Sequence, residues 1–265
     1  MLKIATWNVN SLRVRLPQVL EWLQQQQPDI VALQETKLVD AAFPHAAFTE
    51  MGYHAIFTGQ KAYNGVALLS RTAGQDVRPS LPTLNDEQQR FLATTYTFQN
   101  KALHIVNVYV PNGTEVGCDR YEYKLRWLAS LRSYLQEALQ QFPELIVLGD
   151  FNIAPTDADV LNPTDWINSV LVSEPERRAL QHLFDLGLFD AFRLFSQPEF
   201  SFSWWNYQAA SFRRNDGARI DLILLSNSLK HLALACDIDR VARGQPRPSD
   251  HAPVMLKLRD VFGET

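Results

Sequence analysis

The feature of this sequence that most restricts its fold is a series of short apolar runs separated by turn signals and helical patterns. About ten runs of roughly four to eight residues have the composition of β-strands, and the shortest of them are apolar throughout, as in strands buried on both faces. They occupy residues 2–6, 30–33, 53–57, 66–69, 91–98, 103–108, 145–148, 220–225, 232–238 and 254–258. Because about ten strands are many for one open twisted sheet, we expect two packed mixed sheets.

Amphipathic helical patterns lie between these strands. The first pattern ends at Pro28 and consists of Leu16, Val19, Leu20 and Leu23. A longer core-facing stripe consists of Leu125, Leu128, Leu131, Leu135 and Leu139. Residues 179–186 are also predicted to be helical, and residues 156–173 to be rich in loops. Since the chain has no linker, repeat or low-complexity tract, we expect a single α/β domain over residues 1–265.

Turn signals join two of the predicted strand pairs. Asn64 and Gly65 form a dipeptide typical of tight hairpins, between the third and fourth apolar runs. Asn100 takes the corresponding place between the fifth and sixth runs. Both pairs of strands are therefore expected to be connected by turns.

The composition excludes several classes of protein. The chain has 265 residues, of which 46% are hydrophobic, and its net charge of −4 would not let it coat DNA non-specifically as a basic protein does. Cys118 and Cys236 form no CxxC pair, which argues against a disulfide scaffold or a cysteine-based zinc site and favours a reducing cytoplasm. The sequence shows neither a signal-peptide pattern nor an apolar run of membrane-spanning length.

The seventh apolar run, residues 145–148, leads through Gly149 directly into Asp150, Phe151 and Asn152. Side chains alternate along an extended chain, so Asp150 and Asn152 are expected to point in the same direction. Gly, Asp and Asn also favour turns. This stretch alone therefore supports a plain turn as well as a functional site.

Several other predicted strands begin or end with a polar residue that can do chemistry, and ligands of α/β proteins tend to bind at strand ends. These residues are Asn8, Glu35, Tyr109, Asp221, Asp250 and His251. As structural alternatives, Asn8 could cap a helix or turn, and Glu35 could be a surface charge. Asp221 could pair with Arg219, and His251 could be a structural histidine. The recurrence of such residues at strand ends favours a site.

These residues fall within an ordered set of short motifs: "TWNVNSLR", "LQETK", "YNGVALLSR", "NVYVPNG", "LGDFNIAP", "FSWW", "RIDLIL" and "SDHAPV". The set resembles that of the bacterial exonuclease III family, within the endonuclease/exonuclease/phosphatase superfamily, from residue 2 to residue 258. The resemblance implies a four-layer α/β sandwich with two sheets inside and helices outside. It also implies a monomeric, Mg²⁺- or Mn²⁺-dependent phosphodiesterase that removes nucleotides from 3′ ends of duplex DNA, clears 3′ blocking groups and nicks beside abasic sites.

The resemblance places a metal ligand at Glu35, and Mg²⁺ is a hard cation that prefers oxygen ligands. Asp250 is expected to be a second carboxylate near the metal, and Asn8 to contact metal-bound water or Asp150. The whole set implied to surround the ion is Asn8, Glu35, Asp150, Asn152, Asp250 and His251. Since the sequence has neither an HExxH motif nor paired cysteines, catalytic zinc is not expected.

Phosphodiester hydrolysis needs an activated water and stabilisation of the charge that develops on the phosphate oxygens. The resemblance makes Asp150 the residue that orients or deprotonates the water, and Asn152 a donor to a phosphate oxygen. A protonated His251, held by Asp221, would stabilise the developing charge. Tyr109 either contacts the phosphate or packs against the adjacent loop.

Contacts to the DNA backbone are expected from arginines near the site and from one amide. A single arginine could be merely solvated, but the position of several just before site residues favours phosphate contacts. The candidates are Arg90, Asn112, Arg213, Arg214, Arg240, Arg243 and Arg247. Asn112 replaces a glutamine of better-known members, and the apolar part of residues 163–173 lies near the DNA in relatives.

The stretch "FSFSWW" adds an aromatic candidate. Alternation in an extended chain places Phe200, Phe202 and Trp204 on one face. We expect Phe200 and Phe202 to fill the core. Trp204 matches the family's aromatic residue that lines the pocket for the deoxyribose, with its indole N–H free for a polar partner.

Two other functions stay open at this point. Within the superfamily, the chain could hydrolyse RNA tails, phosphoinositides or sphingomyelin, although no apolar hairpin for membrane insertion is seen. Outside it, the chain could be a catalytically inactive nucleic-acid-binding domain. The presence of all the expected catalytic residue types argues against that second alternative.

Overall fold

Two six-stranded mixed sheets form the centre of the molecule in the computed structural model, which describes residues 1–98 and 101–259. The predicted turn residue Asn100 lies outside the described residues. In sheet A the order is β11 (Ala233–Ile238), β12 (Val254–Leu258), β1 (Leu2–Asn8), β2 (Ile30–Gln34), β4 (Val66–Ser70) and β3 (His54–Thr58). In sheet B it is β5 (Gln75–Arg78), β6 (Phe91–Phe98), β7 (Lys101–Tyr109), β8 (Leu145–Asp150), β10 (Asp221–Ser226) and β9 (Leu188–Asp190).

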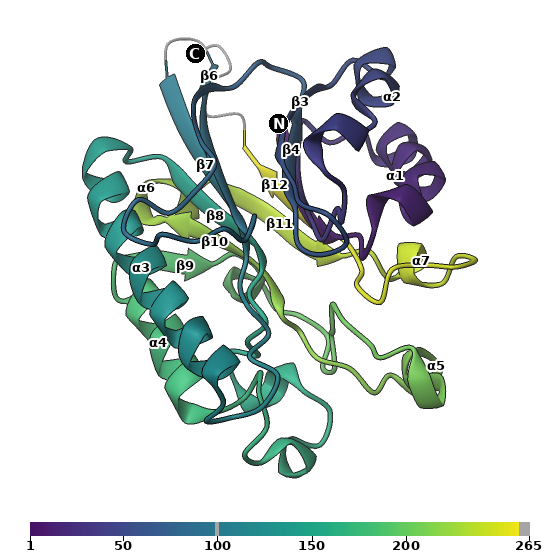
Figure 1. The fold of residues 1–265 in the computed structure, drawn as a ribbon, viewed down its shortest axis with the longest axis vertical. Helices are drawn as coiled ribbons and strands as arrows, with labels where there is room; N and C mark the ends of the chain where they lie inside the picture. The colour runs from purple at the N-terminus through teal and green to yellow at the C-terminus, as the bar shows by residue number, and fades with distance from the viewer. Residues whose placement is uncertain (99–100, 260–265) are drawn as a thin grey trace.

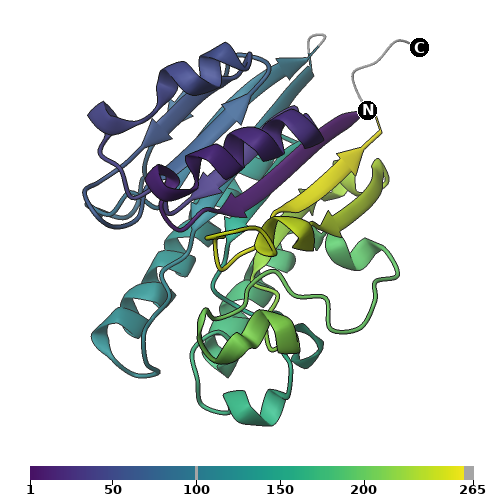
Figure 2. The same cartoon turned by 90° about the vertical axis from the view of Figure 1, so that its right-hand side faces the viewer.

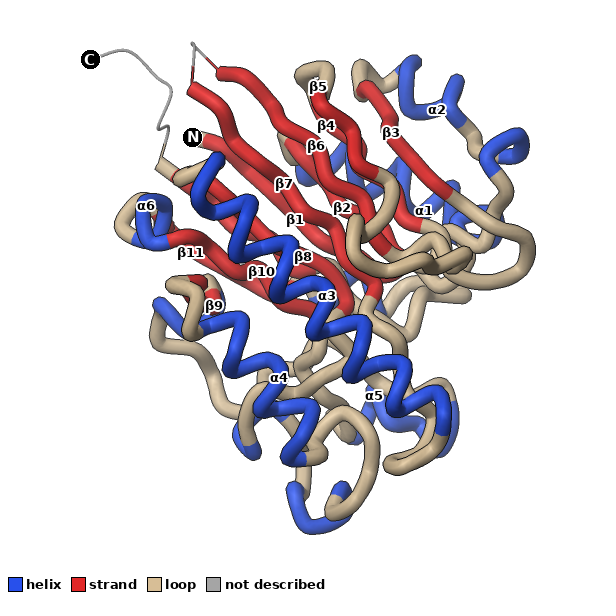
Figure 3. Tube along the Cα trace, turned by 60° about the vertical axis from the view of Figure 1, so that its left-hand side comes forward, coloured by secondary structure: helices blue, strands red, loops and turns tan. Residues whose placement is uncertain are grey.

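Helices cover the outer face of each sheet, so that the predicted two-sheet α/β sandwich is confirmed (Figure 1). Helix α1 (Leu12–Gln26) connects the parallel strands β1 and β2 and, with α2 (His45–Glu50), covers sheet A. Helix α3 (Asp119–Gln141) connects the parallel strands β7 and β8. It runs across sheet B beside α4 (Glu174–Phe184), as Figure 3 shows.

The remaining helical segments are short and lie in the connections. Three are single α-helical turns: α5 (Ser211–Arg214), α6 (Asn227–Lys230) and α7 (Arg240–Arg243). Five are 3₁₀ turns: η1 (Asp40–Ala42), η2 (Asp157–Asp159), η3 (Pro163–Trp166), η4 (Phe192–Leu194) and η5 (Gln208–Ala210). Within the described part of the chain, none of the helices combines the length and apolarity needed to cross a bilayer.

Three apolar layers explain why the strands are hydrophobic on both faces. Ile4, Ile105 and Leu148 belong to the layer between the two sheets. The next residue in β1, Ala5, faces the other way and packs with α1. In the same manner Val147 of β8 packs against α3 and α4. Figure 2 shows α1 lying over β1 and beside β12.

A buried polar connection joins the two sheets. The Asn107 side chain of β7 donates to the carbonyls of Leu33 (3.1 Å) and Ala67 (2.9 Å) in sheet A. Gln34 of sheet A donates in return to Asn107 Oδ1 at 2.8 Å. Because buried polar groups are costly unless paired, these bonds favour one relative position of the sheets.

The sequence missed both edge strands of sheet B and misread one turn. All four residues of β5 are exposed and β9 has three residues, so neither presents an apolar run. Asn64 and Gly65 do have positive φ, 53° and 90°. However, β3 ends at Thr58 and β4 begins at Val66, so they close a longer connection and not a tight hairpin.

The prediction of an extended, alternating "FSFSWW" segment was wrong. Phe200 has a φ of 56° and is 50% exposed, because the chain turns there. Phe202 is buried as expected, but so is Trp205, which alternation would have placed on the opposite face. Trp204 is partly buried, and its backbone forms isolated bridges to Ala218 and His251 in place of a regular strand.

Candidate active site

Strand direction brings the polar strand ends together at one edge of the two sheets. Since β1 and β2 are parallel, Asn8 and the residue after Gln34 leave sheet A on the same side. In sheet B, Tyr109 is paired with Asp150 in the parallel β7–β8 ladder. Asp221 is the register partner of Asp150 in the antiparallel β8–β10 ladder. The segment carrying Asp250 and His251 enters the antiparallel strand β12 at this edge.

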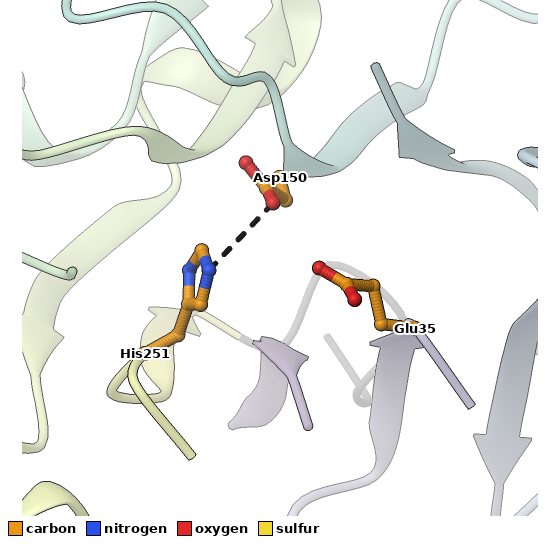
Figure 4. A group of neighbouring side chains, drawn as sticks. All are labelled: Glu35, Asp150 and His251. Atoms are coloured by element: carbon orange, nitrogen blue, oxygen red, sulfur yellow. Dashed lines mark ion pairs between the residues drawn. The ribbon is translucent and has the colours of Figure 1, made fainter. Parts of the chain in front are cut away.

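Glu35, Asp150 and His251 form the centre of the site (Figure 4). One ligand atom from each lies within 4.8 Å of the others. Asn8 bridges the two carboxylates, because its Nδ2 donates to Glu35 Oε1 at 2.8 Å and to Asp150 Oδ2 at 2.9 Å. His251 Nε2 lies 3.8 Å from Asp150 Oδ2. The cluster therefore joins side chains from both sheets.

Asp221 holds the imidazole from the other side. Its Oδ2 lies 2.9 Å from His251 Nδ1, and both side chains are buried. Arg219 instead pairs with Asp159 and Asp190, so the alternative pairing of Asp221 with Arg219 was wrong. Burial disfavours a charged imidazole, but the Asp221 and Asp150 carboxylates outweigh it and raise the pKa of His251 to about 10.

Asp150 is deeply buried among other charged and polar groups. Burial raises the pKa of Asp150 to about 7, and the Asp221 carboxylate adds to this while the His251 charge opposes it. Two hydrogen bonds favour the ionised form, from Asn8 and from the backbone N–H of Asn152 at 2.9 Å. A carboxyl poised near neutral pH is suited to accept a proton.

Two of the three groups in the central cluster, the carboxylates, fit a hard divalent cation. Glu35 and Asp150 offer oxygen atoms, which Mg²⁺ and Mn²⁺ prefer. Lys37 Nζ lies 2.8 Å from Glu35 Oε2, so this carboxylate already faces a cation. A metal-bound histidine must be neutral, and the raised pKa of His251 makes it a poor ligand. Of the three groups, the two carboxylates therefore fit a hard cation better than His251 does.

Asp250 and Asn8 are placed differently from the expected ligand set. Asp250 lies outside the central cluster: Oδ2 accepts from Trp204 Nε1 at 3.1 Å and Oδ1 from Asn10 Nδ2 at 2.9 Å. Asn8 Oδ1 accepts from the backbone N–H of Asn10 at 3.0 Å. Asn8 was expected to contact either metal-bound water or Asp150, and it contacts Asp150.

The "LGDFNIAP" stretch is both a turn and part of the site. β8 ends at Asp150, and Asn152 adopts a left-handed φ of 49°. Asn152 nevertheless meets Asp150, to which its Nδ2 donates at 3.3 Å, while the same group donates to the Val110 carbonyl at 3.0 Å. Asn112 Nδ2 donates to Asn152 Oδ1 at 3.1 Å. Both amide hydrogens of Asn152 thus have protein partners, and it orients Asp150.

Tyr109 and Arg90 lie next to the central cluster. The guanidinium of Arg90 stacks over the Tyr109 ring, 4.5 Å from its centroid. Burial and the Glu35 carboxylate raise the pKa of Tyr109 well above its usual range, so the phenol is a hydrogen-bond donor at neutral pH. Both residues line a groove of about 450 Å³ together with Asn112 and Arg120.

The other expected DNA contacts differ in exposure. Arg213 and Arg247 are exposed. Arg214 is paired with Asp216 at 2.9 Å. Arg243 is 7% exposed and packs on the rings of Tyr207 and Phe212, so it is a structural residue.

Trp204 and Arg240 complete the expected set. Arg240 is exposed and lies over the Trp205 and Phe212 rings. Trp204 meets Trp166 edge-on, with ring centroids 6.4 Å apart. Its indole N–H donates to Asp250 Oδ2, so it has found a polar partner of the kind expected for it.

Among the residues that contact the site and that sequence reasoning missed are Asn10, Lys37 and Lys124. Asn10 holds Asp250, and Lys37 pairs with Glu35 while also donating to Asn10. Asn10 lies two residues after Asn8, and Lys37 lies two residues after Glu35. This closeness to predicted site residues could have identified both. Lys124 lies just before the apolar stripe of the predicted helix and gave no such signal, although it contacts two site loops.

Two carboxylates, an imidazole whose pKa is raised and bridging amides lie at the shared edge of two packed sheets, and they define a hydrolytic enzyme of the α/β-sandwich class. The chain belongs to the endonuclease/exonuclease/phosphatase family, whose model matches residues 5–251. The family resemblance stated from the motifs is thereby confirmed.

Individual relatives agree over nearly the whole chain. Exodeoxyribonuclease III of Haemophilus influenzae is 34% identical, over 97% of this chain and 100% of that protein. The solved structure of the 3′ phosphatase NExo from Neisseria, bound to a product DNA hairpin, is 42% identical with a TM-score of 0.94, over 97% of this chain and 99% of that one. An AP endonuclease from Archaeoglobus fulgidus is 36% identical with a TM-score of 0.93, at the same two coverages.

Proposed function

We infer that this chain is a DNA repair nuclease of the exodeoxyribonuclease III type, which hydrolyses DNA phosphodiesters. The observation that carries the inference is the Glu35–Asp150–His251 cluster, built into a chain that matches exodeoxyribonuclease III along nearly its full length. A neighbour bound to a DNA hairpin product supports the choice of DNA as substrate. We further propose that residues 1–265 form one catalytic domain that acts as a monomer in the cytoplasm.

The proposed mechanism assigns one task to each of four groups. Asp150 accepts a proton from the attacking water, as a positioned carboxylate can. His251 stays protonated and stabilises the negative charge that develops on the phosphate oxygens. Asp221 fixes the ring through Nδ1 and leaves Nε2 to face the reaction. Tyr109 donates a hydrogen bond to the phosphate.

We propose that Glu35 and Asp150 hold Mg²⁺, for which Mn²⁺ can substitute. The bound cation supplies Lewis-acid stabilisation of a phosphoryl oxygen. Asn8 contributes by holding both carboxylates at a fixed spacing, with donor distances of 2.8 and 2.9 Å.

The substrate proposed is double-stranded DNA with a 3′ end or an abasic site. Arg90, Arg213 and Arg247 contact phosphates, which positions the duplex without reading its sequence. Trp204 presents its ring to the deoxyribose, with Trp166 behind it. A base-less or terminal nucleotide can enter such a pocket at lower cost than a paired one, which must first be unstacked.

The test is product analysis on two duplexes, one with a recessed 3′ end and one with an internal abasic site, with Mg²⁺ and with EDTA. Metal-dependent release of nucleotides or nicking supports the proposal. Cleavage of RNA or of a phosphoinositide in preference to both duplexes would favour another branch of the family. DNA binding without cleavage under any metal would indicate an inactive binding domain.

A further inference from the structure

Lys124 of α3 is a buried cation to which the proposed mechanism assigns no task. Its side chain is wholly inaccessible to solvent. We propose that Lys124 is a positioning residue for the hydrolytic reaction, acting through Asn152 and Asn112. The inference rests on the proposed function, because the step that it supports is the one assigned to Asp150.

The ammonium group of Lys124 joins two loops of the site. Nζ donates to the backbone carbonyl of Asn152 at 2.7 Å and to that of Asn112 at 3.1 Å. The same two residues are joined by the bond from Asn112 Nδ2 to Asn152 Oδ1. Lys124 therefore links the loop that follows β7 to the loop that follows β8.

Direct contacts lead from this pair of loops to Asp150. The backbone N–H of Asn152 donates to Asp150 Oδ1 at 2.9 Å, and the Asn152 side chain donates to Oδ2. Asn152 needs such support, because its φ of 49° places it in a left-handed turn beyond the end of the β8 ladder. A shift of its backbone would move both donors that orient Asp150.

The third partner of Lys124 is Glu176 of α4, whose side chain is equally inaccessible. Glu176 also accepts from the backbone N–H groups of Leu171 and Ser173, each at 3.1 Å. It thereby caps α4 and contacts none of the residues that surround Asp150. Within this ion pair, Lys124 makes the contacts to the site loops, whereas Glu176 makes the contacts that cap α4.

Stability alone does not account for a buried lysine here. Replacement of a buried ion pair by neutral residues of similar volume is often neutral or stabilising, whereas removal of one partner is strongly destabilising. A methionine would fill the volume of the lysine side chain, but it offers no donor to the carbonyls of Asn112 and Asn152. A pair of neutral residues could therefore replace the ion pair but not the hydrogen bonds from Lys124 to the site loops.

The test compares three forms of the full chain by kcat at saturating Mg²⁺ and recessed-end duplex, and by thermal melting. The control Glu176→Gln keeps the donors of Lys124, and we expect a lower melting temperature with kcat within about threefold of the unsubstituted protein. In Lys124→Met/Glu176→Gln both charges are removed. We expect it to melt near the control but to lose about 10–100-fold in kcat, the range typical of residues that orient a site from behind, with KM little changed.

Each outcome decides the proposal. A double variant with unchanged kcat would show that the ion pair only stabilises the fold. If this double variant does not fold, Lys124→Gln/Glu176→Gln takes its place, because it removes the ammonium group but keeps polar atoms in the buried space. A loss of about 10-fold or more in kcat relative to Glu176→Gln supports the positioning role, and a kcat equal to that of the control overturns it. Absence of cleavage by the unsubstituted protein would refute the proposed function. This result differs from a failure of the positioning role, in which the unsubstituted protein cleaves normally.

Discussion

Nδ1 of the His251 imidazole lies 2.9 Å from Oδ2 of the Asp221 carboxylate. The two residues come from different sheets: Asp221 begins β10, and His251 precedes β12. Because Asp221 is also the register partner of Asp150, the β8–β10 ladder fixes both carboxylates that face the imidazole. The charge state of His251 therefore depends on the packing of the two sheets against each other.

Asp221→Asn should lower kcat by about 10²–10³ with little change in melting temperature, because the ring loses its fixed orientation and one of the charges that favour its protonated form. The substitution also lowers the pKa of His251, so less of the imidazole is charged above neutral pH. Single-turnover rates and an NMR titration of the ring measure both effects. An unchanged imidazole pKa would show that Asp150 alone keeps the ring charged.

Glu35→Gln should raise the Mg²⁺ concentration required for half-maximal activity by 10-fold or more, roughly the effect of losing a charged oxygen ligand. The amide keeps an oxygen that can accept from Asn8. A metal titration of cleavage rate provides the measurement, with Lys37→Met as the comparison. Identical Mg²⁺ curves for Glu35→Gln and the unsubstituted protein would place the metal elsewhere.

Trp204→Phe and Trp204→Ala separate two roles of the indole. The phenylalanine variant keeps a flat ring but loses the donor to Asp250, and we expect a modest loss of kcat/KM. The alanine variant also loses the sugar-facing surface and should lose far more, on both abasic and 3′-end substrates. Thermal melts provide the control. Normal cleavage by a destabilised Trp204→Ala protein would make Trp204 a core residue.

His104 gives the fold a dependence on pH that is independent of the site. It stacks on Phe142 and lies between Thr95 Oγ1 and the Tyr134 hydroxyl. Burial lowers the pKa of His104 from 6.5 to about 4, so below pH 6.5 protons favour the unfolded chain and stability falls until about pH 4. Between pH 7 and 5 this amounts to about 2 kcal/mol.

The variant His104→Gln should therefore lose about 2 kcal/mol less between pH 7 and 5 than the unsubstituted protein. Urea unfolding at the two pH values gives the difference directly. Equal losses in both proteins would mean that His104 is not the group that titrates.

Much of the fold could be predicted, because a strand buried between two layers must be apolar on both faces. β1, β2, β4 and β8 were found for this reason. The edge strands β5 and β9 carry no such pattern, since an edge strand needs less burial. The four-layer order followed from the strand count and from the family resemblance together.

The site was predictable as a set of residues but not as a set of contacts. Strand ends and motifs identified Glu35, Asp150 and His251, which the topology brings together. The partners of Asp250 and the burial of Arg243 depend on loops whose path is set by positive φ angles, as at Ala209 and Ala210. No periodic pattern of residues predicts such turns. Hydrogen bonds between residues far apart in the chain also produce no regular spacing by which their partners could be recognised in the sequence.

The most direct test of the account is single-turnover cleavage of a recessed-end duplex by Asp150→Asn, alongside a binding titration with the same DNA. We expect a rate lower by about 10²–10⁴, the usual cost of losing a positioned base. We also expect that the variant still binds the duplex, because the contacts assigned to phosphates come from other residues. A near-normal rate in Asp150→Asn would contradict the account and make Asp150 a turn residue.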